Sequence, residues 1–419
     1  MKKILCLALS ILALAACHKE SPSYIVQVSL GSWDHADYTA AQVISRIDTV
    51  NSIIPVGKVI IGWTADKAIY REVGDYLHSK GIKMLLWLPV FAETEGVCDN
   101  SPAVDLWGRT PANYDLTAGE GFRFNCPSDP RNVANVVGLY DRLFSDCGFD
   151  GVFLDRIRSQ SFVGGVSGVL SCGCPICRER YAAEGVDLDA VRAAYDAAGD
   201  SFFEVTADSA GDSFFDVTAD SAGDSFFDVT ADSAGDASPA VTAYERGFRL
   251  SNPIAADFFR AKGKIVSGSV AAVADSLRGR GLEIGLDLYA PFMAPFVGQD
   301  YEILSEHAAF IKPMLYRKTF APAGMGFEYD LLRKAVPGAS GYPAIEMSAE
   351  FLDSQLDAMA PYPCEKYPGI EINYREGIVP TSPEYVRESL EHVMAHHFQG
   401  GVLSWNIMEA PDSHIAALK

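Results

Sequence analysis

The sequence is short of basic residues, of histidine and, after residue 16, of long apolar runs. It has 34 Lys and Arg against 55 Asp and Glu, a formal net charge of −21, so we expect no nucleic acid as partner, because phosphates attract clustered positive charge. A metal-dependent barrel hydrolase would need several histidines at strand ends. Of the 8 His, His35 alone lies near the first expected strand, and His392, His396 and His397 fall in an expected helix. This enzyme class is therefore disfavoured.

Residues 1–16 start with Lys2 and Lys3, continue as an apolar run and end in Leu-Ala-Ala before Cys17. The pattern resembles a bacterial lipoprotein signal peptide, with lipidation at Cys17 and a tether over residues 17–23. An uncleaved membrane anchor is the alternative, but the run is shorter than the roughly 20 residues that a spanning helix needs. We expect a protein of the cell envelope, lipid-anchored in the bacterial outer membrane on its periplasmic or surface face.

Apolar runs that end in polar or aromatic residues recur along the rest of the chain. They alternate with helical patterns, the first of which are expected at 39–53, 66–80 and 129–147. Buried parallel strands have this near-continuous apolar character. The expected strands are 24–33, 58–64, 83–91, 148–158, 282–289, 310–316, 368–374 and 400–406.

Eight alternating units are the number that a closed (β/α)₈ TIM barrel requires. We therefore predict an α/β fold, with one barrel over residues 24–419. A long loop at 92–127 would follow the third strand, and loops of this length are more often functional than idle.

An acidic insertion separates the fourth and fifth expected strands. Residues 198–236 hold tandem copies of a 12-residue unit, with ten Asp and Glu between 200 and 236 and no basic residue. Twelve residues are about 3.3 helical turns, so equivalent positions drift around a helix and form no constant apolar stripe. We expect a tolerated surface insertion. Calcium binding is the alternative, although the Gly-rich ligand spacing of calcium-binding repeats is missing.

Three carboxylates, Asp155, Asp287 and Glu371, fall at the carboxyl ends of expected strands. In a (β/α)₈ barrel these ends meet at one rim, where the active site is built. Cleavage of a glycosidic bond needs one protonated and one ionised carboxyl group. Arg156 and Arg158 should keep Asp155 ionised, whereas the apolar neighbours of Glu371 favour its protonated form. The predicted catalytic residues are Asp155 and Glu371, with Asp287 as the replacement for Glu371.

Aromatic and polar residues gather at the same strand ends. Aromatic rings can stack on the apolar C–H faces of sugars, and polar groups can bind the hydroxyls. Packing inside the barrel is the alternative role for many of them. The predicted substrate-binding residues are Trp33, Trp63, Trp87, Arg156, Tyr289, Lys312, Tyr316, Asn373 and Trp405. A non-catalytic glycan-binding surface lipoprotein would use the same rim.

Seven of the 9 cysteines follow Cys17, an odd number that fits disulfides poorly. Cys172, Cys174 and Cys177 are close enough in sequence to form a structural zinc site. Cys126 is the preferred fourth ligand, and Cys98 and Cys147 are alternatives. Disulfides in an oxidising envelope are the other possibility. No cofactor is expected for catalysis.

Two motifs resemble bacterial glycoside-hydrolase-like (β/α)₈ proteins. Asp150-Gly-Val-Phe-Leu-Asp155 matches their fourth strand, and Ile311-Lys-Pro-Met-Leu-Tyr316 matches their sixth. The resemblance implies a glycosidase acting on an extracellular or periplasmic oligo- or polysaccharide. Carboxylates on strands four and seven are also the pattern of the retaining barrel glycosidases, although that clan has Asn-Glu where this chain has Leu154-Asp155. Chitinase-like enzymes have Glu where this chain has Ile157, so the stereochemical outcome stays open.

The Cys-x-Cys-x-x-Cys loop is similar to one that follows the fourth strand in glycoside hydrolase family 42 β-galactosidases. In that family a fourth cysteine comes from upstream. The similarity implies a structural site that braces the loop after the fourth strand.

Overall fold

The computed structural model describes residues 23–94, 96–113, 122–206 and 248–419. The predicted signal peptide, Cys17 and most of the tether lie outside this part of the chain. Within the described residues, no helix combines the length and apolar character needed to cross a bilayer.

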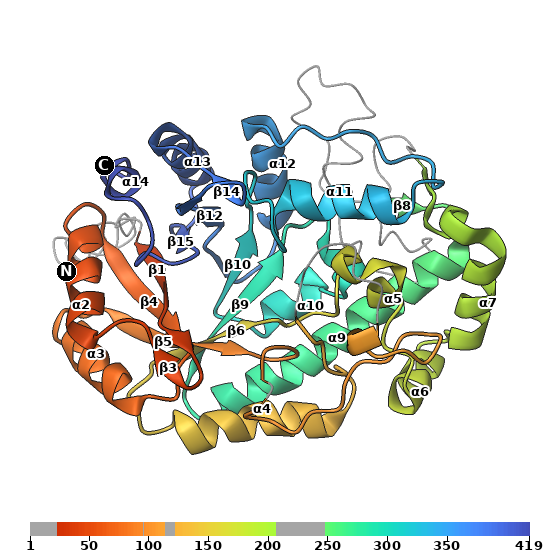
Figure 1. The fold of residues 1–419 in the computed structure, drawn as a ribbon, viewed down its shortest axis with the longest axis horizontal. Helices are drawn as coiled ribbons and strands as arrows, with labels where there is room; N and C mark the ends of the chain where they lie inside the picture. The colour runs from red at the N-terminus through yellow and green to blue at the C-terminus, as the bar shows by residue number, and fades with distance from the viewer. Residues whose placement is uncertain (1–22, 95, 114–121, 207–247) are drawn as a thin grey trace, which may run out of the picture.

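Eight parallel strands close into a barrel, which confirms the predicted fold class (Figure 1). The circle closes because β15 pairs with β1 and β9 pairs with β10. In chain order its strands are β1 (Tyr24–Ser29), β4 (Val56–Gly62), β5 (Lys83–Pro89), β6 (Gly151–Asp155), β9 (Glu283–Tyr289), β10 (Phe310–Met314), β12 (Gly369–Glu371) and β15 (Val402–Ser404).

Helices surround the strands (Figure 1). The longer ones are α2 (Ala40–Asn51), α3 (Lys67–Ser79), α4 (Pro130–Leu143), α7 (Leu188–Ala198), α9 (Pro253–Arg278), α11 (Met325–Ala335), α12 (Ala349–Met359) and α13 (Pro383–Ala395). The shorter ones are α5 (Gly165–Val169), α6 (Pro175–Ala183), α10 (Tyr301–Glu306) and α14 (Asp412–Ala416). Side-chain caps begin most of them: Thr39 and Gln42 form a capping box at α2, and Asp129 precedes Pro130 at α4.

Short strand pairs and single turns complete the loops. The minor strands are β2 (Gly31–Ser32), β3 (His35–Ala36), β7 (Val205–Thr206), β8 (Arg249–Leu250), β11 (Glu365–Lys366), β13 (Tyr374–Arg375) and β14 (Val379–Pro380). The 3₁₀ turns are η1 (Pro111–Asn113), η2 (Phe162–Gly164), η3 (Gly199–Phe203) and η4 (Ala294–Val297).

The barrel is filled by side chains and is not a pore. Its interior holds a buried cluster made of Ile25, Ile60, Leu85, Trp87, Phe153, Phe310, Tyr367 and Val402. At the amino-terminal ends of the strands, Glu283 accepts from both Lys58 and Lys83 at 2.5 Å. Apolar packing and ion pairs thus occupy the base, and open space remains at the carboxyl ends.

The described part of the first copy of the 12-residue unit, residues 198–206, packs against the helices around the barrel. Phe202 and Phe203 are fully buried, and Tyr195, Phe162 and Phe259 pack against one or both of them. β7 follows directly and pairs antiparallel with β8. The insertion therefore starts from a docked segment, whereas residues 207–247, with the remaining copies, lie outside the described residues.

Candidate active site

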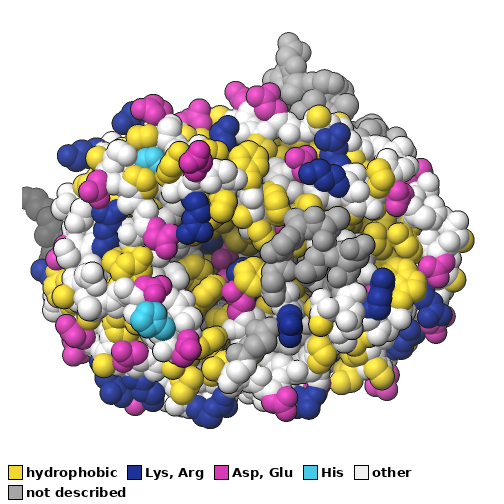
Figure 2. All heavy atoms as spheres, viewed as in Figure 1, with side chains coloured by type: hydrophobic (Ala, Val, Ile, Leu, Met, Phe, Trp, Pro, Cys, Tyr) yellow, Lys and Arg dark blue, Asp and Glu magenta, His cyan; other side chains and the backbone are white. Residues whose placement is uncertain are grey.

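A cavity of about 360 Å³ lies at the carboxyl ends of the barrel strands, within the size range of small-ligand sites. Figure 2 shows a hollow near the middle of one face, with acidic, basic and hydrophobic side chains around it. The predicted site residues that line the cavity are Trp63, Trp87, Asp155, Arg156, Asp287, Lys312, Tyr316 and Trp405.

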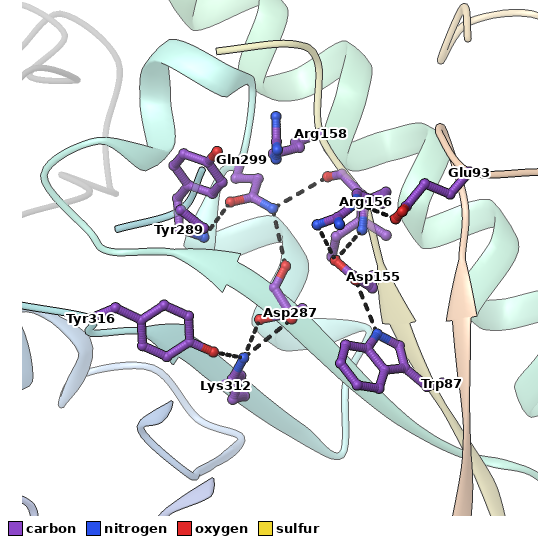
Figure 3. Close-up of polar contacts among 12 residues, drawn as sticks. Trp87, Glu93, Asp155, Arg156, Arg158, Asp287, Tyr289, Gln299, Lys312 and Tyr316 are labelled. Atoms are coloured by element: carbon purple, nitrogen blue, oxygen red, sulfur yellow. Dashed lines mark hydrogen bonds and ion pairs between the residues drawn. The ribbon is translucent and has the colours of Figure 1, made fainter. Parts of the chain in front are cut away.

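Asp155 ends β6 and is held by two hydrogen bonds and an ion pair (Figure 3). The Trp87 indole N–H donates to it at 3.0 Å, the Arg156 backbone N–H at 2.5 Å, and the Arg156 guanidinium lies 3.6 Å away. Arg156 adopts a positive φ of 54° and its Nε also donates to Glu93 at 2.7 Å. Burial opposes ionisation of Asp155, but these donors outweigh it and lower its pKa. Asp155 is therefore the ionised carboxylate of the cavity.

Asp287 comes from the neighbouring strand β9 and contacts Lys312 on β10 (Figure 3). Lys312 Nζ lies 3.0 and 3.2 Å from the two carboxylate oxygens and 2.6 Å from the Tyr316 hydroxyl. Burial raises the pKa of Asp287 to about 7, with the Asp155 charge adding to it and Lys312 opposing it. Burial lowers the pKa of Lys312, but Asp287 and Tyr316 outweigh it and the net shift is upward. Lys312 thus stays charged while Asp287 exchanges its proton near neutral pH.

Glu371 ends β12 but is not among the described residues that line the cavity. It is fully buried. Its Oε1 accepts from the Lys318 backbone N–H at 2.6 Å and from the Tyr385 hydroxyl at 2.8 Å. Burial raises its pKa to about 7. These contacts make Glu371 an anchor for the loop after β10, and its catalytic role stays a prediction.

Three other predicted residues bind residues that contact or belong to the cavity lining. Trp33 donates to the Glu93 carbonyl at 2.9 Å, and Tyr289 donates to Glu328 at 2.7 Å. The Asn373 side chain accepts from the Trp405 backbone N–H at 2.6 Å and thereby fixes a residue that lines the cavity. None of the three is among the described lining residues.

Several residues that line the cavity were not predicted from the sequence. Gln27, Phe122, Met314 and residues 321–323 also face the cavity. Gln27 is 1% exposed; its Oε1 accepts from Ser404 at 2.5 Å, and its Nε2 has no hydrogen-bond partner. The Trp63 indole N–H is likewise buried without one. Two unused donors at a cavity wall suit a hydroxylated ligand. Gln27 could have been noticed in the sequence, because it is the one polar residue inside the apolar run 25–28.

The four predicted metal ligands, Cys126, Cys172, Cys174 and Cys177, lie together. Their sulfur atoms are all within 4.8 Å of one another, and Cys126 lies 3.5 Å from both Cys174 and Cys177. Tetrahedral zinc with Zn–S bonds of about 2.3 Å would place the sulfurs about 3.8 Å apart. The cluster could therefore hold a metal ion.

The alternative fourth ligands point elsewhere. Cys98 donates to the Asn135 carbonyl and Cys147 to the Leu143 carbonyl. All seven cysteines of the described chain are free thiols.

Solved structures of two glycosidases are similar in fold to this chain. No family model matches the chain, and no curated protein does. The glycoside hydrolase domain of PgaB (BpsB) from Bordetella bronchiseptica is similar at 13% identity, over 95% of this chain and 98% of that one, with a TM-score of 0.55. The α-L-fucosidase isoenzyme 2 from Paenibacillus thiaminolyticus is similar at 10% identity, over 95% of this chain but 48% of that one, with a TM-score of 0.51. At these identities the likeness shows the barrel fold alone.

Proposed function

We propose that the protein is a glycoside hydrolase in which Asp287 is the general acid and Asp155 is the nucleophile or general base. The observation that carries the proposal is the pair itself. Two buried carboxylates line one cavity, one with its pKa lowered and the other with its pKa raised to about 7. Glycosidases divide the two roles between carboxyl groups in this way.

The chemistry follows from the two protonation states. Asp287 donates its proton to the glycosidic oxygen while the bond from that oxygen to the anomeric carbon breaks. Asp155 either attacks the anomeric carbon or takes a proton from the attacking water. Lys312 and Tyr316 position Asp287, and Trp87 and Arg156 hold Asp155. Trp63 and Trp405 offer faces for the sugar ring.

The carboxylate pair favours this class over a non-catalytic glycan-binding lipoprotein, and a glycoside hydrolase domain that is similar to this chain at a TM-score of 0.55 has the same barrel fold. We place the substrate among oligo- and polysaccharides outside the cytoplasm, because residues 1–17 resemble a lipoprotein signal. Lipidation of Cys17 is tested by metabolic labelling with a fatty acid, which a Cys17→Ser variant should not incorporate.

The deciding experiment compares Asp155→Asn, Asp287→Asn and Glu371→Gln on a panel of aryl glycosides and oligosaccharides. The two Asp variants should lose about 10²–10⁴-fold in kcat, the contribution typical of general acid–base catalysis. Glu371→Gln keeps its hydrogen-bond acceptor and should retain most activity. Loss in Glu371→Gln with activity in Asp287→Asn would restore Glu371 as the acid. Sugar binding by the unmodified protein with no hydrolysis of any glycan would favour the binding protein.

For the cysteine cluster we propose structural zinc. Two backbone N–H groups donate to its sulfurs, from Val104 to Cys172 at 3.3 Å and from Cys177 to Cys174 at 3.5 Å, which suits thiolate ligands. Cys126 precedes α4, and the other three follow α5. A bound metal would thus tie the loop after β5 to the segment after β6, and both contribute lining residues, Phe122 and Arg156.

A further inference from the structure

Two aromatic side chains outside the cavity are unusually exposed. Phe320 is 56% exposed and Tyr374 is 53% exposed. The other large hydrophobic residues exposed in the described chain are Ile176 at 37% and Ile254 at 39%, on α6 and at the start of α9. An apolar ring left in water forgoes the free energy of burial, so the exposure of these two rings requires an explanation.

The two rings come from loops that follow neighbouring strands of the barrel. Phe320 lies in the loop after β10, and Tyr374 begins the β13–β14 hairpin after β12. β10 and β12 are paired. The Phe320 backbone N–H donates to the Ile378 carbonyl in that hairpin at 2.7 Å. The rings therefore sit on two loops that are bonded to each other at the same rim.

The loop that carries Phe320 is fixed in place. Its ends are joined by a bridge between Tyr316 and Gly324. The Lys318 backbone N–H donates to Glu371 at 2.6 Å, and the Ala323 backbone N–H donates to Glu328 at 2.9 Å. The backbone that carries Phe320 is thus fixed by these contacts. A side chain on a fixed backbone loses less conformational entropy when a ligand binds.

Both residues are next in sequence to residues that line the cavity or support its lining. Phe320 directly precedes residues 321–323, which line it. Tyr374 directly follows Asn373, whose side chain holds the backbone of Trp405, another lining residue. A ligand that projects from the cavity over the loop at 316–324 would meet the two rings next.

We infer that Phe320 and Tyr374 form an external subsite for a sugar unit of a longer glycan, whose scissile bond lies in the cavity. The inference rests on the proposed function and extends it, because it makes the substrate a chain and not a single glycoside. Sugar rings present apolar C–H faces to exposed aromatic rings, and their hydroxyls stay in water. This suits a subsite that is half open to solvent.

The test uses Phe320→Ala, Tyr374→Ala and their double variant in the otherwise complete chain. Ile254→Ala serves as the control, because it also removes an exposed apolar side chain but lies on α9. Binding is measured by affinity electrophoresis through gels that contain xylan, mixed-linkage β-glucan or glycol chitin. Hydrolysis of aryl monoglycosides is measured on the same variants.

Each aromatic variant should bind the retarding polysaccharide about 2- to 10-fold more weakly, as expected for loss of one stacking contact. The aromatic variants should hydrolyse aryl monoglycosides at the rate of the unmodified protein. The Ile254→Ala control should match the unmodified protein in both binding and hydrolysis, and Phe320→Tyr should bind polysaccharide as the unmodified protein does. The inference fails if no polysaccharide retards the unmodified protein, or if the double variant migrates like it in every gel. Retardation that depends on both rings, without hydrolysis of any glycoside, would retain the subsite and refute the proposed catalysis.

Discussion

Replacement of Lys312 by Met tests how far this lysine lowers the pKa of Asp287, which burial raises. Lys312 Nζ lies 3.0 Å from Asp287 and both groups are buried. An opposite charge at this range lowers a carboxyl pKa by about 1–3 units. Loss of Lys312 should therefore raise the pKa of Asp287 from about 7 to roughly 8–10.

The assay is kcat/KM as a function of pH, which reports the groups of the free enzyme. Since the general acid must be protonated, activity falls as pH rises through the pKa of Asp287. The basic limb should therefore lie near pH 7 in the unmodified protein and move upward in Lys312→Met. Lys312→Arg keeps the charge and should move it by less than about 1 unit. The acidic limb, set by Asp155, should also move upward but by less, because Lys312 is the smallest of the causes that lower the pKa of Asp155, and Arg156 and Trp87 stay in place. A basic limb unchanged in Lys312→Met would refute the assignment of Asp287 as the acid.

Four further changes test the metal site, the role of Glu371 and the packing of the repeats. The purified protein should carry about one zinc per chain and Cys174→Ser much less, as measured by elemental analysis; disulfides among these thiols would contradict this. Glu371→Ala should free the loop at 316–324 and speed its cleavage by protease, whereas Glu371→Gln should not; equal cleavage would exclude the anchor role. Deletion of residues 207–230 should leave the melting temperature nearly unchanged. Phe203→Ala in that shortened chain should lower the free energy of unfolding by about 3–5 kcal/mol, and a smaller loss would show that the docked copy is dispensable.

The barrel could be predicted because its strands are buried on both faces, so each one reads as an apolar run. The predicted ends of the strands agree less well with the structure. The run 368–374 contains β12, which covers only Gly369–Glu371, because the apolar pattern continues after the inter-strand hydrogen bonds end.

The reach of the strand pattern also explains which site residues could be predicted. Asp287 and Lys312 lie within regular strands, where alternation fixes the side-chain direction, and both line the cavity, as does Asp155 at the end of β6. Glu371 is the last residue of its strand, and its carboxylate binds Lys318 and Tyr385, which belong to a loop and a helix. Loop residues such as Phe122 could not be predicted, because their positions depend on the folded path of the chain.

The docked first repeat has a consequence at the level of the gene. Twelve residues are a whole number of codons, so unequal recombination between copies changes the length of the array without shifting the reading frame. The segment that packs into the shell, Ser-Phe-Phe-Glu-Val-Thr at 201–206, recurs at 213–218 and 225–230 with only Glu204 replaced by Asp. Loss of one unit therefore leaves another unit with the same two phenylalanines to take its place. Such a locus can gain and lose units between lineages while the barrel fold is inherited unchanged.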